Sequence, residues 1–137
     1  MKYFIYTFLL GLLIASAFYF NTVTGAFLYS EPVHEHVSVN EFKNLLEEDV
    51  KLMDIRTLEE YQQGIIRGAD NIDFYSSSFK EDLDGLDKRE TYLIYCRTGS
   101  RTEESLEIMK ELGFNEVYGL EGGITNWAGQ GNIVSRP

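Results

Sequence analysis

Apolar and polar residues follow two distinct patterns along the chain, one near the N-terminus and another over the remainder. Residues 3–20 carry no charge and are apolar all round in a helical projection, whereas a buried helix of a globular domain is apolar on one side only. As a helix this segment would extend about 27 Å, close to the roughly 30 Å hydrocarbon layer of a bilayer. The run therefore predicts one apolar N-terminal helix that enters a membrane.

The segment 1–23 is predicted to be either a signal peptide or a transmembrane anchor. Ala15-Ser16-Ala17 has the small-residue pattern of a cleavage site, and residues 24–26 form a weaker one. Because the apolar run exceeds the roughly 7–15 residues of a signal peptide, we favour an uncleaved anchor that contacts the membrane through residues 3–23. Lys2 should stay in the cytoplasm in either case. The predicted localisation is therefore extracytoplasmic: in a bacterium, the periplasm or the outer side of the inner membrane.

Beyond this segment, short apolar stretches alternate with stretches of helical spacing. Residues 24–36 are polar and without a clear period, and we interpret them as a linker. The apolar pattern predicts strands over 50–55, 92–95 and 117–120, and helices over 41–46, 58–63, 76–83 and 102–112, with a last short helix through Trp127. This alternation predicts one α/β domain over residues 37–130, with a mainly parallel sheet flanked by helices in three layers, and a tail over 131–137.

The charge and the cysteine count narrow the possible functions. From Glu31 onward the chain has 22 acidic and 11 basic residues, a formal charge of −11, so a nucleic-acid partner is not expected. A single cysteine excludes a disulfide within the chain. The two histidines and this cysteine have no spacing typical of a metal site, and nothing in the sequence indicates a cofactor.

Cys96 is the candidate nucleophile because of its position and its neighbours. It follows the predicted strand 92–95 and opens a helix, so its sulfur should meet loop amides and a helix N-terminus. A free thiol has a pKa near 8.5, and a working nucleophile at neutral pH needs a shift of roughly two units, about 3 kcal/mol. A helix terminus supplies at most about 2 kcal/mol. Loop amides, together with Arg97 and Arg101, are expected to supply the rest.

The segment CRTGSRT at 96–102 resembles the active-site loop of rhodanese-like domains. Further blocks resemble the other signatures of this family in the same order: Asp54-Ile55-Arg56, residues 60–64, residues 68–72, and residues 113–124 followed by Trp127. The resemblance covers about residues 37–127. It implies the three-layer rhodanese fold, here preceded by the apolar N-terminal helix.

The resemblance also implies a sulfurtransferase. Cys96 would take sulfane sulfur from thiosulfate, polysulfide or a persulfide and pass it to a thiophilic acceptor such as cyanide or a thiol. The substrate, a small anionic sulfur compound, would be bound by the loop residues Arg97, Thr98, Gly99, Ser100 and Arg101. A sulfur-binding module that delivers persulfide to a partner protein is the alternative. Four residues separate Cys96 from Arg101, one fewer than in related phosphatases, which disfavours a phosphatase or an arsenate reductase.

Two further features of the resemblance concern residues near the loop. Asp54 and Arg56 match a family block, and we favour a supporting ion pair at the strand end over direct contact with substrate. Where the family often has Gly-His-Ile, this chain has Gly64-Ile65-Ile66. Because His34 and His36 fall in the predicted linker, no histidine of the domain is expected to assist proton transfer.

Overall fold

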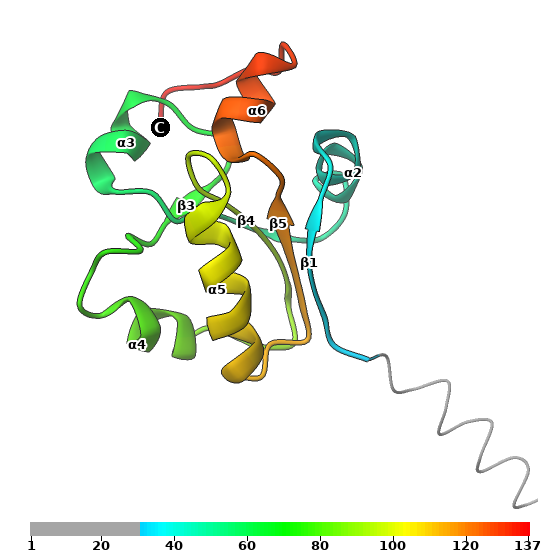
Figure 1. The fold of residues 1–137 in the computed structure, drawn as a ribbon, viewed down its shortest axis with the longest axis vertical. Helices are drawn as coiled ribbons and strands as arrows, with labels where there is room; N and C mark the ends of the chain where they lie inside the picture. Colours follow the sequence, from blue (N-terminus) through cyan, green and yellow to red (C-terminus); the bar gives the residue numbers. More distant parts are fainter. Residues whose placement is uncertain (1–30) are drawn as a thin grey trace, which may run out of the picture. The chain divides into compact units, whose positions relative to one another are not determined.

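The computed structural model describes residues 31–137, which form a parallel β-sheet with helices on both faces (Figure 1). The five strands lie in the order β1-β5-β4-β2-β3, and each neighbouring pair is parallel. In chain order the elements are β1 (Val33–Val37), α2 (Val39–Leu45), β2 (Lys51–Asp54), α3 (Leu58–Gln63), β3 (Asp70–Asn71), α4 (Phe79–Asp84), β4 (Thr91–Tyr95), α5 (Ser100–Glu111), β5 (Glu116–Leu120) and α6 (Gly123–Gly129). The predicted α/β fold class is confirmed.

The central strand β4 divides the core into two parts. Leu93 and Tyr95 belong to the apolar cluster that includes side chains of α2 and α6. Ile94 and Cys96 belong to the cluster on the other face, which includes side chains of α4 and α5. Figure 1 shows α2 on one side of the sheet and α4 and α5 on the other. A strand covered on both faces needs apolar side chains at every position, which explains its uninterrupted apolar sequence.

The N-terminal side of the domain differs from the prediction. The predicted signal or anchor segment, 1–23, lies outside the described residues, and no helix within residues 31–137 is long and apolar enough to cross a membrane. The predicted linker, 24–36, is wrong at its end, because Val33–Val37 form β1 and pair with β5. This strand lies at the sheet edge and its central side chains are largely exposed. Its sequence therefore has almost no apolar signal.

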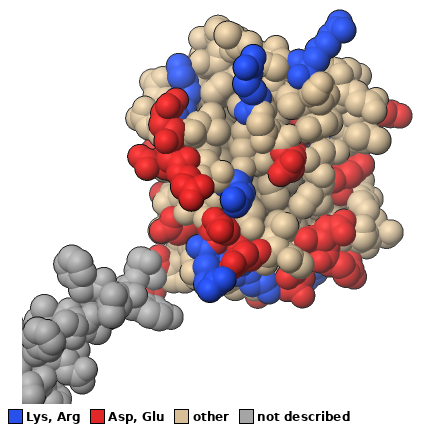
Figure 2. Space-filling view, turned by 180° about the vertical axis from the view of Figure 1, so that it is seen from behind, with Lys and Arg blue, Asp and Glu red and all other residues tan. Residues whose placement is uncertain are grey.

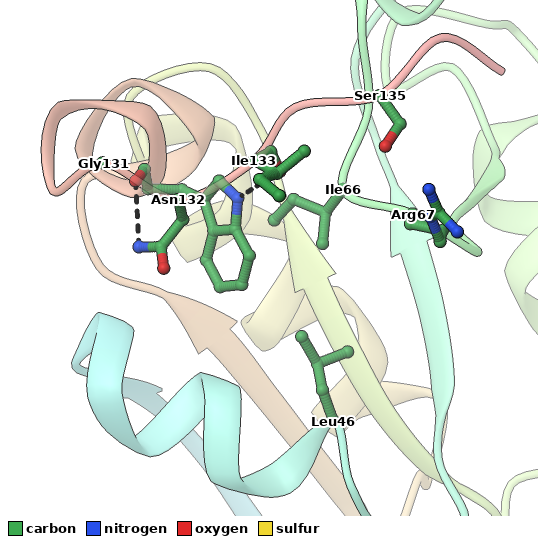
Figure 3. Close-up of a pocket in the computed structure, with 8 residues that line it drawn as sticks. Leu46, Ile66, Arg67, Gly131, Asn132, Ile133 and Ser135 are labelled. Atoms are coloured by element: carbon green, nitrogen blue, oxygen red, sulfur yellow. Dashed lines mark hydrogen bonds between the residues drawn. The ribbon is translucent and has the colours of Figure 1, made fainter.

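The C-terminal residues 131–137 also belong to the domain, contrary to the predicted tail. Ile65 and Ser135 form an antiparallel bridge, with N–O distances of 2.7 and 2.8 Å in the two directions. The indole Nε1 of Trp127 donates to the carbonyl oxygen of Ile133 at 3.0 Å. Figure 3 shows the hollow that this segment closes, between Leu46, Ile66 and Asn132. Residues 131–137 make these contacts through backbone groups, which any sequence possesses, so the residue pattern of the segment did not reveal them.

Helix α6 begins directly against the end of β4. The amide of Ile124 donates to the carbonyl oxygen of Cys96 at 2.9 Å, and the amide of Thr125 donates to that of Arg97 at 3.1 Å. Gly123 has a φ of +58°, and a Cβ on it would lie 2.5 Å from the Cys96 oxygen. The absence of a side chain at Gly123 therefore allows the two segments to approach this closely.

We predict that Gly123→Ala lowers the free energy of unfolding by about 1–3 kcal/mol, because the added methyl group crowds a backbone that has no room to move. Gly129→Ala is the matched control in the same helix, since a Cβ there meets nothing within 4 Å. Urea denaturation of both variants measures the difference. Equal stability of the two variants would contradict this account.

Candidate active site

The candidate site is the loop between β4 and α5, with Cys96 at its base. The Cys96 side chain is 0% exposed, and the amide of Gly99 donates to its sulfur at 3.1 Å. Gly99 caps α5 in the left-handed region, with a φ of +105°. This conformation, which favours glycine, turns the loop amides toward the sulfur. The structure therefore confirms that Cys96 lies where a strand end, a tight loop and a helix N-terminus meet.

The loop lowers the pKa of the Cys96 thiol below its ordinary value. Burial acts in the opposite direction and by itself would raise the pKa. The Thr102 side chain and the amides of Thr102, Gly99 and Thr98, which favour the charged form of the sulfur, outweigh it. We expected the positive charges of Arg97 and Arg101 to lower the pKa of Cys96 as well, but hydrogen-bond donors of the loop are the main cause. A lowered pKa increases the fraction of thiolate, which is the nucleophilic form of cysteine.

Arg101 is held beside the loop by an ion pair that the sequence analysis did not identify. Its two terminal nitrogens donate to the two carboxylate oxygens of Glu60 at 2.8 and 3.0 Å. The side chains are 11% and 22% exposed. The guanidinium also lies 5.4 Å from the centre of the Tyr75 ring, within range of a cation–π contact. Arg101 is thus oriented and largely neutralised before any substrate arrives.

Glu60 is itself fixed by the start of α3. Its carboxylate accepts from the amide of Thr57 at 3.1 Å, and its own amide donates to the Thr57 hydroxyl at 3.3 Å, which together form a capping box. The hydrogen bond from Arg101 is the main reason that the pKa of Glu60 is lowered to about 2. The Thr57-x-x-Glu60 spacing is typical of a capping box and could have indicated the start of α3. It does not indicate that Glu60 also pairs with Arg101.

Arg97 presents a contrasting environment. Its side chain is exposed, and it forms no ion pair within the described part of the chain. Figure 2 shows basic side chains at the upper end of the molecule, where the strands of Figure 1 end, with most acidic side chains lower down. An incoming anion therefore meets free positive charge at this end, although the domain as a whole is acidic.

Asp54 and Arg56 form the expected ion pair at the end of β2. Arg56 Nε donates to both carboxylate oxygens at 2.9 and 3.0 Å, and a terminal nitrogen of the same guanidinium donates to the Gly64 carbonyl oxygen at 2.6 Å. The residues are 0% and 6% exposed. The pair ties the strand end to the end of α3 and leaves little access for a substrate. Its contacts therefore agree with the supporting role.

The histidines lie in the domain, contrary to the expectation that they would fall in a linker. His34 and His36 are part of β1. His36 lines a hollow together with Thr98, Gly99 and Ser100. A strand order that places β1 beside β5 brings this residue to the loop, which its position in the sequence did not indicate. Within residues 31–137 no cluster of histidine, cysteine and carboxylate residues could hold a metal ion.

Comparison with known proteins identifies similar domains. The model of the rhodanese-like domain family matches residues 38–130. A protein named sulfurtransferase from Allochromatium vinosum is 33% identical over 90 residues, which is 66% of this chain and 82% of that protein. The tRNA uridine(34) hydroxylase of Bdellovibrio bacteriovorus is 32% identical over 103 residues, covering 71% of this chain. The chain spans only 29% of that hydroxylase's length.

Solved structures support the same relationship. A rhodanese-related protein from Thermoplasma volcanium superposes with a TM-score of 0.66 and 25% identity, covering 73% of this chain and 96% of that one. A rhodanese-like domain protein from Staphylococcus aureus gives a TM-score of 0.61 and 29% identity, covering 68% and 90% of the two chains. The likeness thus extends over nearly the whole of each of these small domains.

We predict that Glu60→Gln destabilises the protein at neutral pH but not near pH 2. A carboxylate whose pKa falls on folding contributes stability above its ordinary pKa of 4.5, and this contribution is lost as the pH falls toward about 2. Thermal unfolding at several pH values should show the wild type and the variant converging between pH 5 and pH 2. Glu59→Gln, an exposed neighbour in α3, is the control. A pH-independent difference would count against the ion pair.

Asp54→Asn should lower the free energy of unfolding by about 3–5 kcal/mol, because it leaves the Arg56 charge buried without its partner. Asp87→Asn is the control, since Asp87 pairs with Arg89 at the surface and little change is expected there. Urea denaturation measures both. If the two substitutions had similar effects, the buried pair would not be the anchor of this strand end.

Proposed function

Because the chain belongs to the rhodanese-like domain family, we propose that it is a sulfurtransferase that carries sulfane sulfur as a persulfide on Cys96. The observation that carries the proposal is the buried Cys96 sulfur, which accepts hydrogen bonds from its own loop and whose pKa is lowered by them. The donors we propose are thiosulfate, polysulfide or another persulfide, and the acceptor is a thiophile such as cyanide or a thiol.

In the loading step the Cys96 thiolate attacks the outer sulfur of thiosulfate. A new S–S bond forms to Cys96 Sγ, the S–S bond of thiosulfate breaks, and its electron pair leaves with sulfite. The enzyme then holds a persulfide anion, and the total charge is unchanged. The amides of Thr98 and Gly99, which already face the sulfur, are placed to stabilise this anion.

In the release step an acceptor such as cyanide attacks the outer sulfur of the persulfide. A carbon–sulfur bond forms, the S–S bond to Cys96 breaks, and its electron pair returns to Sγ as thiolate. Thiocyanate leaves and the starting state is restored. A single cysteine is sufficient for this two-step cycle because the acceptor comes from solution.

The charge distribution supports an anionic donor. Arg97 is exposed in the loop, and the end of the molecule that contains the loop displays basic side chains (Figure 2). Arg101 is already paired with Glu60, so its role would be to support the loop more than to bind the donor. We therefore assign the attraction of the anion chiefly to Arg97.

A persulfide-delivery module is the second candidate, and exposed apolar residues favour it. Leu58 is 56% exposed and Tyr75 is 69% exposed, and Tyr75 lies against Arg101. A partner protein that accepts sulfur would contact Tyr75, beside Arg101. Turnover with thiosulfate and cyanide separates the two candidates, because a delivery module would load sulfur but release it slowly to cyanide.

The activity in the name of the hydroxylase relatives is not proposed for this chain. The match covers less than a third of the relative from Bdellovibrio bacteriovorus. Residues 31–137 are also strongly acidic, which disfavours contact with RNA.

The proposed location is extracytoplasmic, with residues 1–23 as a signal or an anchor. The support is the uncharged run and the position of Lys2 in the sequence.

We predict that the full-length protein gains about 32 Da, the mass of one sulfur atom, on Cys96 after incubation with thiosulfate or polysulfide. Cyanide should remove this mass. Intact-mass spectrometry followed by peptide mapping measures both steps. Cys96→Ser is the matched variant, which should keep its fold and gain no sulfur. Sulfur gain in that variant, or none in the folded wild type with any donor, would overturn the proposal.

A further inference from the structure

Thr102 is an unexplained feature of the site. It is 0% exposed, and its hydroxyl oxygen is one of two buried side-chain polar atoms in the described residues without a hydrogen-bond partner. The other is Nε2 of His34. An unsatisfied buried hydroxyl is unfavourable and is uncommon in folded proteins. The position of this hydroxyl therefore needs an explanation.

The structure of α5 directs the Thr102 side chain toward the loop. The residue lies in the first turn of α5, where side chains point back toward the helix N-terminus and thus toward Cys96. Ser105, one turn further on, donates to the carbonyl oxygen of Arg101 at 2.8 Å, as helical hydroxyls commonly do. Thr102 makes no such bond.

The methyl group of Thr102 is held by β5. A Cβ on Gly119 would lie 2.6 Å from Cγ2 of Thr102 and 3.2 Å from Cδ1 of Leu106, so Cγ2 occupies space that any other residue at 119 would fill. Because a β-branched side chain has few allowed rotamers in a helix, fixing the methyl group also fixes the hydroxyl. Gly119 and Leu106 thereby define the direction of the Thr102 hydroxyl.

We propose that the Thr102 hydroxyl donates a hydrogen bond to Cys96 Sγ whenever that sulfur carries negative charge. A thiol is a weak acceptor, whereas a thiolate is a strong one, so the hydroxyl gains its full partner only in the ionised state. The pKa of Cys96 agrees with this role, because among the groups that lower this pKa the Thr102 side chain has the largest effect.

This inference rests on the proposed function and extends it to both steps. Before loading, the hydrogen bond raises the fraction of thiolate. During release, the electron pair of the breaking S–S bond returns to Sγ, and the hydroxyl stabilises the departing thiolate without giving up its proton. A donor that acts on the developing charge accelerates the step more than one that binds both states equally.

The test compares Thr102→Val with Thr102→Ser in the full-length protein. Valine keeps the shape and both branches but lacks the hydroxyl, whereas serine keeps the hydroxyl but lacks the methyl group. The readout is the pKa of Cys96, taken from the rate of alkylation by iodoacetamide as a function of pH, without any sulfur donor. We expect the valine variant to raise this pKa by about one to two units. The serine variant should raise it less, because serine keeps the donor and loses only the methyl group that orients it.

Release of sulfur to cyanide provides the second readout. The valine variant should release sulfur at least tenfold more slowly than the wild type, and the serine variant should lie between the two, because its hydroxyl is present but less firmly oriented. An unchanged pKa in a folded valine variant would overturn the proposal, as would a serine variant with the same defect as valine. If valine prevented folding, Thr102→Ala would replace it in the same comparison with serine.

The two readouts keep this inference distinct from the proposed function. Alkylation of Cys96 requires no persulfide, so a raised pKa in the valine variant would support the hydrogen bond even if no protein gained sulfur. Sulfur gain in the wild type together with an unchanged pKa in the valine variant would reject the role of Thr102 and leave the sulfurtransferase proposal intact.

Discussion

The site depends on the need to stabilise a negative sulfur atom that is removed from water. Cys96 is fully buried, and burial alone would raise the pKa of its thiol. Water is not available to solvate the thiolate, so protein donors must do so. Three features meet this requirement: the sharp turn at Gly99, the amides that face the sulfur, and the Thr102 side chain.

The packing around the loop keeps these donors in position. On one side, α6 starts against the Cys96 and Arg97 carbonyl groups, which only a glycine at 123 permits. On the other side, Glu60 of α3 holds Arg101. A loop fixed from both sides does not have to reorganise as charge moves between the two sulfur atoms, and preorganised donors of this kind are effective in catalysis.

The two arginines of the loop have different environments and so different uses. Arg101 is paired with Glu60 and rests on Tyr75, which makes it a structural part of the loop. Arg97 is exposed and supplies charge at the end where a donor would enter. Two arginines of one sequence motif thus have different roles. Arg101 supports the loop because Glu60 lies beside it, whereas Arg97 is left to attract an anion.

The sequence by itself determined the alternation of strands and helices, the parallel sheet and the location of Cys96 at a strand end, because these follow from apolar spacing and local turn residues. Only the tertiary structure decided that β1 joins the sheet, that Glu60 pairs with Arg101 41 residues away, and that the Thr102 methyl group packs against Gly119. A local pattern specifies what a segment prefers to form. The partners of that segment depend on the strand order and on where a glycine of a neighbouring element leaves room for a side chain. The spacing of nearby residues in the sequence predicts neither.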